Sequence, residues 1–450
     1  MQKLIIILFL LSTIYSERGD LLSYTYKGSK LADNIQVELE NYVDELGASS
    51  IINPNSIENI KLYSIVYESI DQFGEYSEAS GLISLPDNYN IFCPLFIFGH
   101  GTQVRRHSAP SMGSFNTLNS WISSSGYIYI EPDYLGLGVS EISHPYHLKD
   151  VTAASMIDII YAAKELCDLL DVVNYNSQLF IAGYSEGGYA TMAAVKEIEE
   201  NYDDLNITLS FPMAGAYDLS GTMVDLMLST DVYADPFYLP FFILSYIEKY
   251  NLGPISDFFL PKYVYLLPDL FSGEHSGGYI NRFLPDIPIN MMLPSMVSEF
   301  QNNEEFPFRV YLEENNLLDW IPESPMYIFH GLADERVPYE NSEVAYNKFI
   351  ENGSTSVYYE ALPEVYGGHQ EAAPFCLIQS FFILEDAKQV LHKGDINQDS
   401  LINIIDIISV LNSILLDDTD SLDLLIDLNY DDLLNVFDLI ILIEDILKYE

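Results

Sequence analysis

The sequence predicts an α/β fold with a mostly parallel sheet that helices cover on both faces. Short apolar runs typical of buried strands alternate with helical patterns over much of the chain. The chain has 450 residues, 49% of them hydrophobic, which is enough to bury a large core and to form two domains. Two segments depart from the alternation: an aromatic-rich interruption and an acidic C-terminal repeat.

The first sixteen residues, MQKLIIILFLLSTIYS, have the pattern of a cleaved secretory signal. An apolar run from Leu4 to Leu11 follows one lysine, and Ile14 and Ser16 stand where a signal peptidase inspects the chain. The run is too short to span a bilayer, and no cysteine follows it for lipidation. We therefore expect a secreted protein, extracellular or periplasmic, with no transmembrane segment. A buried first strand or a membrane anchor is the alternative.

Three strands are expected over residues 61–98, in the runs KLYSIVYESI, EASGLISLP and IFCPLFIFG. Strands and helices then alternate, which implies parallel strands joined by helical crossovers. The expected strands cover residues 127–132, 178–182, 207–215, 326–330 and 356–361, and the expected helices cover residues 151–171 and 188–200.

About a hundred residues between Ala216 and Met326 interrupt this alternation. Residues 233–265 within them hold eleven aromatic residues and four prolines, which is too apolar for a solvated linker. We expect residues 219–322, approximately, to form a cap over the carboxyl edge of the sheet. A helical subdomain packed only for stability is the alternative.

The formal charge of -48 comes from 67 acidic and 19 basic residues. Nucleic acids and anionic membrane surfaces would repel such a chain, whereas a cationic partner or bound calcium would suit it. The three cysteines, Cys93, Cys167 and Cys376, lie in apolar runs without metal-ligand spacing, so we expect buried thiols.

Ser185 stands in GYSEGG, between an apolar run and a helical pattern of small residues. A strand, a tight turn and a helix in this order can raise a serine clear of the backbone as a nucleophile. Because the chain has 25 glycines, the G-x-S-x-G pattern arises by chance in roughly one such chain in ten. The assignment therefore depends on finding a base, an acid and an oxyanion site.

Each of these parts has a candidate. Asp334 follows the strand in MYIFHGLADERVP, and His369 lies in a glycine-bordered loop in EVYGGHQEA. In LFIFGHGT, a turn after a strand could offer the amide of Gly101 or Thr102 to an oxyanion, and the amide of Glu186 would be the second donor.

These motifs together resemble the secretory lipase family of α/β-hydrolases, the group similar to fungal lipase A enzymes. The likeness runs from about residue 60 to residue 385 through HGT, EPDYLGLGVS, GYSEGG, HG-x-x-D-x-x-VP and a late GGH, in the family's order. The resemblance implies an α/β-hydrolase fold with a cap domain, lipase or esterase activity, and Ser185, Asp334 and His369 as the catalytic triad.

Other residues compete for these roles. Glu335 could be the acid if Asp334 only caps a helix. His144 and His147 could bind a metal, but no third ligand lies within reach in the sequence.

Residues 391–450 carry fourteen acidic and two basic residues and contain a repeat. DINQDSLINIID and DLNYDDLLNVFD are offset by 32 residues, and apolar helical runs over 407–416 and 439–447 follow them. In both copies, oxygen ligands fall at the positions with which a short loop surrounds calcium. The side-chain ligands are Asp395, Asn397, Asp399, Asn403, Asp406, Asp427, Asn429, Asp431, Asn435 and Asp438, and the carbonyl ligands are those of Leu401 and Leu433.

This C-terminal segment resembles a type I dockerin, which implies a small all-α domain with two structural calcium ions and a cohesin-like partner. Two features depart from that family. Loop position six is Ser400 or Asp432 where glycine is usual, and positions ten and eleven are the apolar pairs Ile404-Ile405 and Val436-Phe437. These pairs could pack against the protein itself, so a calcium module with another partner, or an acidic solvated tail, stays open.

The sequence thus predicts a secreted serine hydrolase that cleaves carboxylic esters through an acyl-enzyme, with a signal over 1–16, a hydrolase domain over 17–390 and a calcium-binding domain over 391–450. No catalytic cofactor is expected. The alternatives are a carbohydrate esterase that removes acetyl or feruloyl groups, a secreted serine peptidase on the same fold, and a non-enzymatic adhesion or scaffold component.

Overall fold

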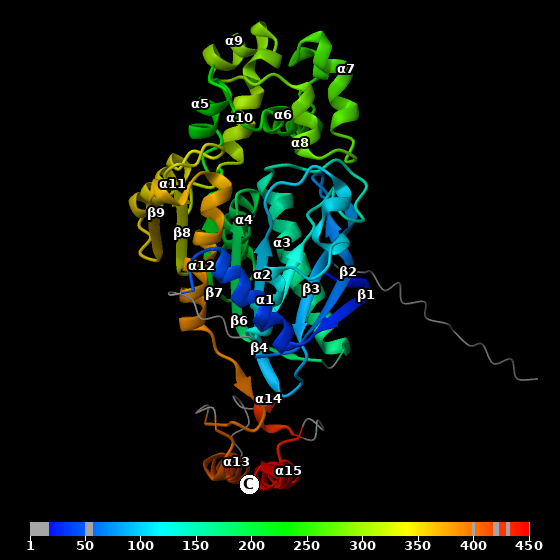
Figure 1. Ribbon diagram of the computed structural model, residues 1–450, viewed down its shortest axis with the longest axis vertical. Coiled ribbons are helices and arrows are strands. Elements are labelled where there is room, and N and C mark those ends of the chain that lie inside the picture. Colours follow the sequence, from blue (N-terminus) through cyan, green and yellow to red (C-terminus); the bar gives the residue numbers. More distant parts are fainter. Residues whose placement is uncertain are drawn as a thin grey trace, which may run out of the picture.

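The computed structural model describes residues 18–49, 57–170, 172–397, 401–416, 423–428 and 433–449. The expected signal over residues 1–16 lies outside them. Figure 1 shows three levels along the long axis: a helical insertion, a sheet with flanking helices, and a pair of C-terminal helices. No described helix is long and apolar enough to cross a bilayer.

The described strands form one ten-stranded sheet in the order β1-β2-β3-β5-β4-β6-β7-β8-β9, with β10 beside β4. In the sheet, neighbouring strands are parallel from β5 through β4, β6, β7 and β8 to β9. At one edge, β1 pairs with β2, β2 with β3, and β3 with β5, all antiparallel. The predicted mostly parallel α/β fold is therefore confirmed. The strands are β1 (Leu21–Lys30), β2 (Ile60–Ile70), β3 (Tyr76–Pro86), β4 (Ile91–Gly99), β5 (Ile128–Pro132), β6 (Asn174–Tyr184), β7 (Ile207–Met213), β8 (Met326–Gly331), β9 (Val357–Leu362) and β10 (Leu391–His392).

Each face of the sheet has its own hydrophobic core. Along β4, Ile97 joins the core beneath α3 (Lys149–Leu170) and α4 (Glu186–Asn201), while Phe96 joins the core beneath α12 (His369–Ala387). Because both faces are covered, every residue of β4 is buried, which explains the uninterrupted apolar run in the sequence. The other helices around the sheet are α1 (Ala32–Glu45), α2 (Thr117–Ser124) and α11 (Glu340–Asn352).

Residues 219–322, called here the helical insertion, lie beyond the carboxyl ends of the parallel strands (Figure 1). Most aromatic rings of this segment are buried in a core that is continuous with the one beneath α3 and α4, and within the insertion Tyr250 stacks on Tyr311 with the ring centroids 3.8 Å apart. Tyr265, in contrast, is exposed. The insertion contains α5 (Thr222–Met227), α6 (Tyr238–Tyr250), α7 (Pro261–Leu270), α8 (Gly277–Ile280), α9 (Pro294–Asn302) and α10 (Pro307–Glu314).

The structure adds elements that the sequence did not predict. Strand β1 and helices α1, α2, α11 and α12 were not expected, and the strand expected over 207–215 ends at Met213. His369, expected in a loop, is the first residue of α12. The three cysteines are free and buried, as predicted.

The C-terminal helices α13 (Ile404–Leu416) and α15 (Val436–Tyr449) pack on each other, with the short helix α14 (Asp423–Ile426) between them in the chain. Each long helix begins three residues earlier than the predicted 407 and 439, inside the repeated loop. The predicted domain boundary at residue 391 coincides with β10, where Leu391 pairs with Phe92 of β4.

Candidate active site

Ser185 lies on a sharp turn between β6 and α4. Its backbone has φ 62° and ψ -119°, a left-handed conformation that is strained for a residue with a side chain. A Cβ atom on Gly183 would lie 2.2 Å from the carbonyl oxygen of Gly187, and one on Gly187 would lie 1.8 Å from that of Gly99. Only glycine therefore permits this approach of strand, turn and helix.

Ser185, His369 and Asp334 form a hydrogen-bonded chain. Nε2 of His369 lies 2.9 Å from Oγ of Ser185, and Nδ1 of the same ring lies 2.5 Å from Oδ2 of Asp334. All three side chains are buried or nearly so. The structure thus brings together, from three separate elements, the residues that the sequence pattern selected. This is the arrangement in which a histidine can take a serine proton while a carboxylate orients the ring.

The Asp334 carboxylate is enclosed by donors. Oδ1 accepts the backbone N–H groups of Arg336 at 2.9 Å and Val337 at 2.8 Å, and Nε2 of His330 lies 3.2 Å from Oδ2. Burial alone would raise the pKa of this carboxyl group, but the hydrogen bonds from His330 and His369 outweigh burial and lower it below the usual value. Asp334 is therefore ionised at neutral pH.

Glu335, the alternative acid, does not reach the histidine ring. Its Oε2 accepts the backbone N–H of His369 at 2.9 Å, at the first turn of α12. The geometry therefore assigns the ring contact to Asp334 and leaves Glu335 as a helix-terminal acceptor.

The expected oxyanion residues surround the serine. A Cβ atom on Gly101 would lie 3.8 Å from Cβ of Ser185, so this backbone passes beside the serine. The next residue, Thr102, is held in place by a hydrogen bond between its Oγ1 and the Tyr146 hydroxyl, which lie 2.9 Å apart. The Glu186 amide lies at the N-terminus of α4, where backbone N–H groups lack helical partners.

His144 and His147, the alternative metal ligands, have other environments. His144 Nε2 lies 2.6 Å from Oε1 of Glu186, and this buried pair keeps the pKa of Glu186 below its usual value, although burial opposes that direction. Burial lowers the pKa of His147 to about 4, so this ring is neutral at pH 7. Among the described residues, no group of three or more histidine, cysteine or acidic side chains could hold a metal ion.

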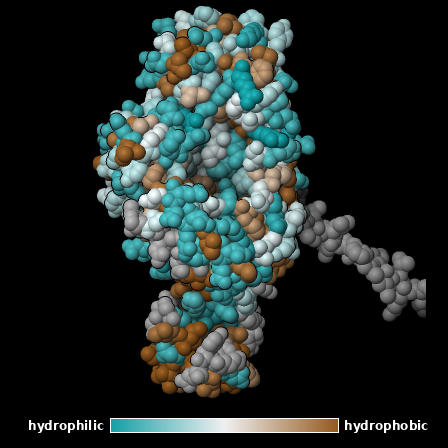
Figure 2. Space-filling view, viewed as in Figure 1, coloured by the Kyte–Doolittle hydropathy of each residue, from teal (hydrophilic) through white to brown (hydrophobic). Residues whose placement is uncertain are grey.

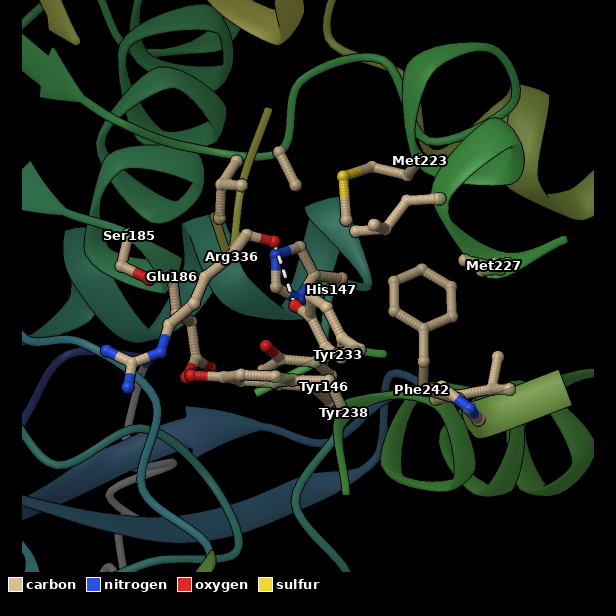
Figure 3. Close-up of a pocket in the computed structure, with 15 residues that line it drawn as sticks. Tyr146, His147, Ser185, Glu186, Met223, Met227, Tyr233, Tyr238, Phe242 and Arg336 are labelled. Atoms are coloured by element: carbon tan, nitrogen blue, oxygen red, sulfur yellow. Dashed lines mark hydrogen bonds between the residues drawn. The ribbon is translucent and has the colours of Figure 1, made fainter. Parts of the chain in front are cut away.

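A mainly apolar pocket opens beside Ser185 (Figure 3). It encloses about 640 Å³, part of it open to solvent, and receives Met223, Met227 and Phe242 from the helical insertion. Met227 also lines a second apolar cavity of about 290 Å³ deeper in the insertion, as does Leu239. The two cavities therefore meet at these two side chains.

Several pocket residues could not be found from the sequence. Tyr146 and His147 come from the segment before α3; no sequence pattern marked Tyr146, and His147 was marked only as an alternative metal ligand. Oε2 of Glu186 and Nδ1 of His147 are buried there without a hydrogen-bond partner among the described residues. Arg336, two residues after Asp334, forms an ion pair with Asp235 of the insertion at 2.5 Å.

The helical insertion is also tied to the Asp334 loop through Tyr233. The Tyr233 hydroxyl donates to the carbonyl oxygen of Arg336 at 2.8 Å, the dashed contact in Figure 3. Two contacts therefore join the insertion to the Asp334 loop, this hydrogen bond and the Arg336–Asp235 ion pair.

The repeated acidic loops have matching internal contacts. Oδ2 of Asp406 accepts the N–H of Asn403 at 2.8 Å, and Oδ2 of Asp438 accepts that of Asn435 at 2.9 Å. Both asparagine side chains donate to the carbonyl two residues earlier, that of Leu401 or Leu433, at 2.9 Å. Asp395, Asn397 and Asp427 lie in the described parts of the loops, whereas the predicted ligands Asp399, Asn429 and Asp431 lie outside the described residues.

The apolar pairs at loop positions ten and eleven do not pack against the protein. Ile404, Ile405, Val436 and Phe437 are exposed by 67%, 50%, 54% and 62%, so the suggestion that they pack internally is wrong. Figure 2 shows apolar surface gathered over these C-terminal helices.

Known structures resemble this one over most of its length. A protein of Legionella pneumophila assigned as a hydrolase is 27% identical, with a TM-score of 0.74, and the match covers 82% of this chain and 98% of that one. The rice cell wall degrading esterase LipA from Xanthomonas oryzae is 26% identical, with a TM-score of 0.70 and the same coverage. Candida antarctica lipase A in its closed state shares the fold at 15% identity, with a TM-score of 0.60 over 83% of this chain and 82% of that one.

No protein-family model matches the chain, and no curated protein sequence matches it significantly. The structural neighbours are nevertheless hydrolases, esterases and lipases of the α/β-hydrolase type, and their fold is the one described above.

Proposed function

We propose that this protein, a carboxylic ester hydrolase, cleaves esters with an apolar acyl portion through an acyl-enzyme on Ser185. The observation that supports this most directly is the hydrogen-bonded chain Ser185–His369–Asp334 at the mouth of an apolar pocket. Serine is a weak nucleophile alone, and this chain supplies what activates it.

In the proposed reaction, Nε2 of His369 removes the Ser185 proton as Oγ attacks the ester carbonyl. The resulting oxyanion is held by the amide of Glu186 and by that of Gly101 or Thr102. The imidazolium returns its proton to the leaving alcohol, and the carbonyl re-forms as the acyl-enzyme. Water then attacks with His369 as base, which releases the acid and restores Ser185.

Asp334 holds the histidine in the tautomer that this sequence of steps needs. Its carboxylate accepts a hydrogen bond from the Nδ1–H group of His369, so that the unprotonated Nε2 can accept a hydrogen bond from the Ser185 hydroxyl. The lowered pKa of Asp334 keeps it charged opposite the imidazolium that forms during each half-reaction.

The helical insertion would act as a cap that binds the acyl portion. Met223, Met227 and Phe242 present no hydrogen-bonding groups that suit a sugar or a charged acid, and burial of an alkyl chain against them is favourable by about 0.8 kcal/mol per methylene.

A carbohydrate esterase is the second candidate. Its specific support is the 26% identity to an esterase described as degrading the rice cell wall. A secreted serine peptidase has no comparable support from the neighbours.

We further propose that the protein is secreted and that its C-terminal module binds two calcium ions. The donor set of Asp395, Asn397, Asn403 and Asp406 with the Leu401 carbonyl consists of oxygen atoms, which suits calcium, and Oδ2 of Asp406, which accepts the N–H of Asn403, retains a second lone pair. A cohesin-like protein is the proposed partner of this module.

The test is ester hydrolysis by wild type and by Ser185→Ala. We expect the variant to keep its circular dichroism spectrum and to lose activity by about a thousandfold or more. Profiling p-nitrophenyl esters of increasing chain length should favour butyrate or longer chains over acetate. Best activity on acetylated xylan with none on longer esters would select the carbohydrate esterase. Failure of a fluorophosphonate probe to label the wild-type protein would reject the triad.

A further inference from the structure

Another pocket, separate from the two cavities described above, lies on the sheet face that α2 and α12 cover. It encloses about 1040 Å³, part of it open to solvent, and shares no lining residue with the pocket beside Ser185. Its walls come from α1, β4, β5, α2 and α12, and the proposed reaction uses none of the residues that line it. We call it the aromatic pocket, because it is lined by the rings of Tyr42, Phe96, Phe98, Trp121 and Phe381.

One carboxyl group faces these rings. Because side chains alternate along a strand, Glu131 of β5 lies on the same face of the sheet as Tyr129. The other buried residues of the core on that face are apolar or aromatic. Glu131 is only 7% exposed, and its Oε2 accepts a hydrogen bond from the Tyr129 hydroxyl at 3.0 Å. Burial of an ionised carboxylate destabilises the folded protein unless a group of opposite charge lies beside it.

No such partner exists among the described residues of the pocket wall, since none of those lining it is lysine, arginine or histidine. The remaining polar residues there are Asn116, Thr117 and Ser380, which are uncharged. Burial accordingly raises the pKa of Glu131 to about 8. The site combines a carboxyl group without a basic partner and a wall of aromatic faces.

Both parts suit an organic cation. The faces of aromatic rings carry negative potential, and cages of such rings recognise quaternary ammonium groups. Trp121 and Phe381, with centroids 4.6 Å apart, already form one corner of such a cage. The net charge of -48 also attracts cations toward the protein. A metal ion is a poorer fit, since one carboxyl group among rings offers too few ligands.

We propose that the aromatic pocket binds an alkylammonium or quaternary ammonium compound, whose charge pairs with Glu131 while its methyl groups contact the rings. A neutral apolar molecule could use the rings but would gain nothing from the carboxyl group. The proposal does not depend on the esterase assignment.

The chain offers a direct optical test. It has two tryptophans, Trp121 in this pocket and Trp320 elsewhere, so Trp320→Phe leaves one indole to report on the site. We would titrate this variant with choline and with neohexanol, its uncharged carbon isostere. The titrations would be made at about pH 9, where Glu131 is ionised. The titratable groups near Glu131 are Tyr129, Asp133 and Tyr134, and Tyr42 also lines the pocket, whereas the pocket walls from β4, α2 and α12 add no charged side chain.

We expect both compounds to quench Trp121 fluorescence saturably, with a dissociation constant for choline at least tenfold lower than that for neohexanol. Adding Glu131→Gln, which keeps an acceptor for the Tyr129 hydroxyl, should remove that preference without changing esterase activity. Phe98→Leu, which keeps an apolar wall, should weaken choline but not neohexanol and serves if the glutamine variant fails to fold. Equal affinity for the two compounds, undiminished choline binding in both variants, or no response to either compound would overturn the proposal.

Discussion

Nε2 of His330 lies 3.2 Å from Oδ2 of Asp334, the same carboxylate oxygen that Nδ1 of His369 contacts at 2.5 Å. His330 is fully buried, and its Nε2 also lies 2.9 Å from the carbonyl oxygen of Val337, so this nitrogen carries the proton. Nδ1 then accepts from the hydroxyl of Ser342, 2.7 Å away. The proposed acid, Asp334, thus contacts a second histidine besides His369.

His330→Ala should lower kcat/KM by about 10- to 100-fold, because a hydrogen bond to a charged group contributes about 1.5–3 kcal/mol. Steady-state kinetics on a p-nitrophenyl ester would measure this. Ser342→Ala, which removes only the donor to the far nitrogen, is the matched control and should lose less. Unchanged kinetics in a folded His330→Ala protein would mean that Asp334 is positioned without it.

Asp334→Asn should reduce kcat by about a thousandfold or more, because an amide at this position stabilises the wrong histidine tautomer. Glu335→Gln should cost less than about tenfold, since a glutamine oxygen still accepts the His369 N–H. Kinetics of the two variants at equal protein concentration would compare them. The opposite ranking would make Glu335 the catalytic acid.

Replacing Met227 by tryptophan should shorten the preferred acyl chain. Met227 and Leu239 line both the pocket beside Ser185 and the deeper cavity, so a larger side chain closes the passage between them. Activity on long-chain p-nitrophenyl esters should fall by about tenfold or more relative to butyrate. Tyr265→Trp, on the exposed surface of the same insertion, is the control and should leave the profile unchanged. A profile that Met227→Trp does not alter would place the acyl chain elsewhere.

The free energy of unfolding of Glu131→Gln, relative to that of the wild type, should increase as the pH rises from about 4.5 to about 8. The folded-state pKa of Glu131 is raised from 4.5 to about 8, so over this range the unfolded chain loses a proton that the folded chain keeps. Wild-type stability therefore falls with rising pH, by up to about 4 kcal/mol from this group. The neutral variant lacks this loss. Thermal melts of both proteins at several pH values would show a difference that grows toward pH 8, and a constant difference would contradict the raised pKa.

Calcium removal should unfold the C-terminal helices and spare catalysis. The acidic loops bring carboxylates together, and their mutual repulsion is relieved by a bound cation. In the full-length protein, a chelator should expose residues 395–449 to limited proteolysis while ester hydrolysis continues. Changing Asp395 and Asp427 to alanine should give the same cleavage with calcium present. Equal protection with and without calcium would make the loops purely structural.

The sequence predicted the parallel strands well for a physical reason. Strand segments buried on both faces, such as β4 and the second half of β6 from Leu179, produce continuous apolar runs, and the motifs that end them fall at the carboxyl edge where the site forms. Ser185, Asp334 and His369 could be selected in this way, because each follows a recognisable strand or glycine pattern.

Other features carry no such local signal. Helix α12 is apolar around much of its circumference, so its period is obscured, and β1 is largely exposed. The pocket residues Tyr146 and Met227 come together only through tertiary packing of distant segments. His330 lies near the end of β8, but its contact with Asp334 depends on the turn that follows the strand.

Strand β4 has different neighbours at its two ends. Its first residues, Ile91 and Phe92, pair with β10, which leads to the C-terminal helices, and its last residue, Gly99, leads to Gly101 beside Ser185. At about 3.3 Å per residue, this nine-residue strand separates the two ends by roughly 30 Å. A scaffold that bound α13 and α15 would therefore hold the enzyme by the end of its long axis that lies opposite the helical insertion (Figure 1). In that orientation an immobilised molecule could still work on an insoluble surface, such as a lipid droplet or a fibre.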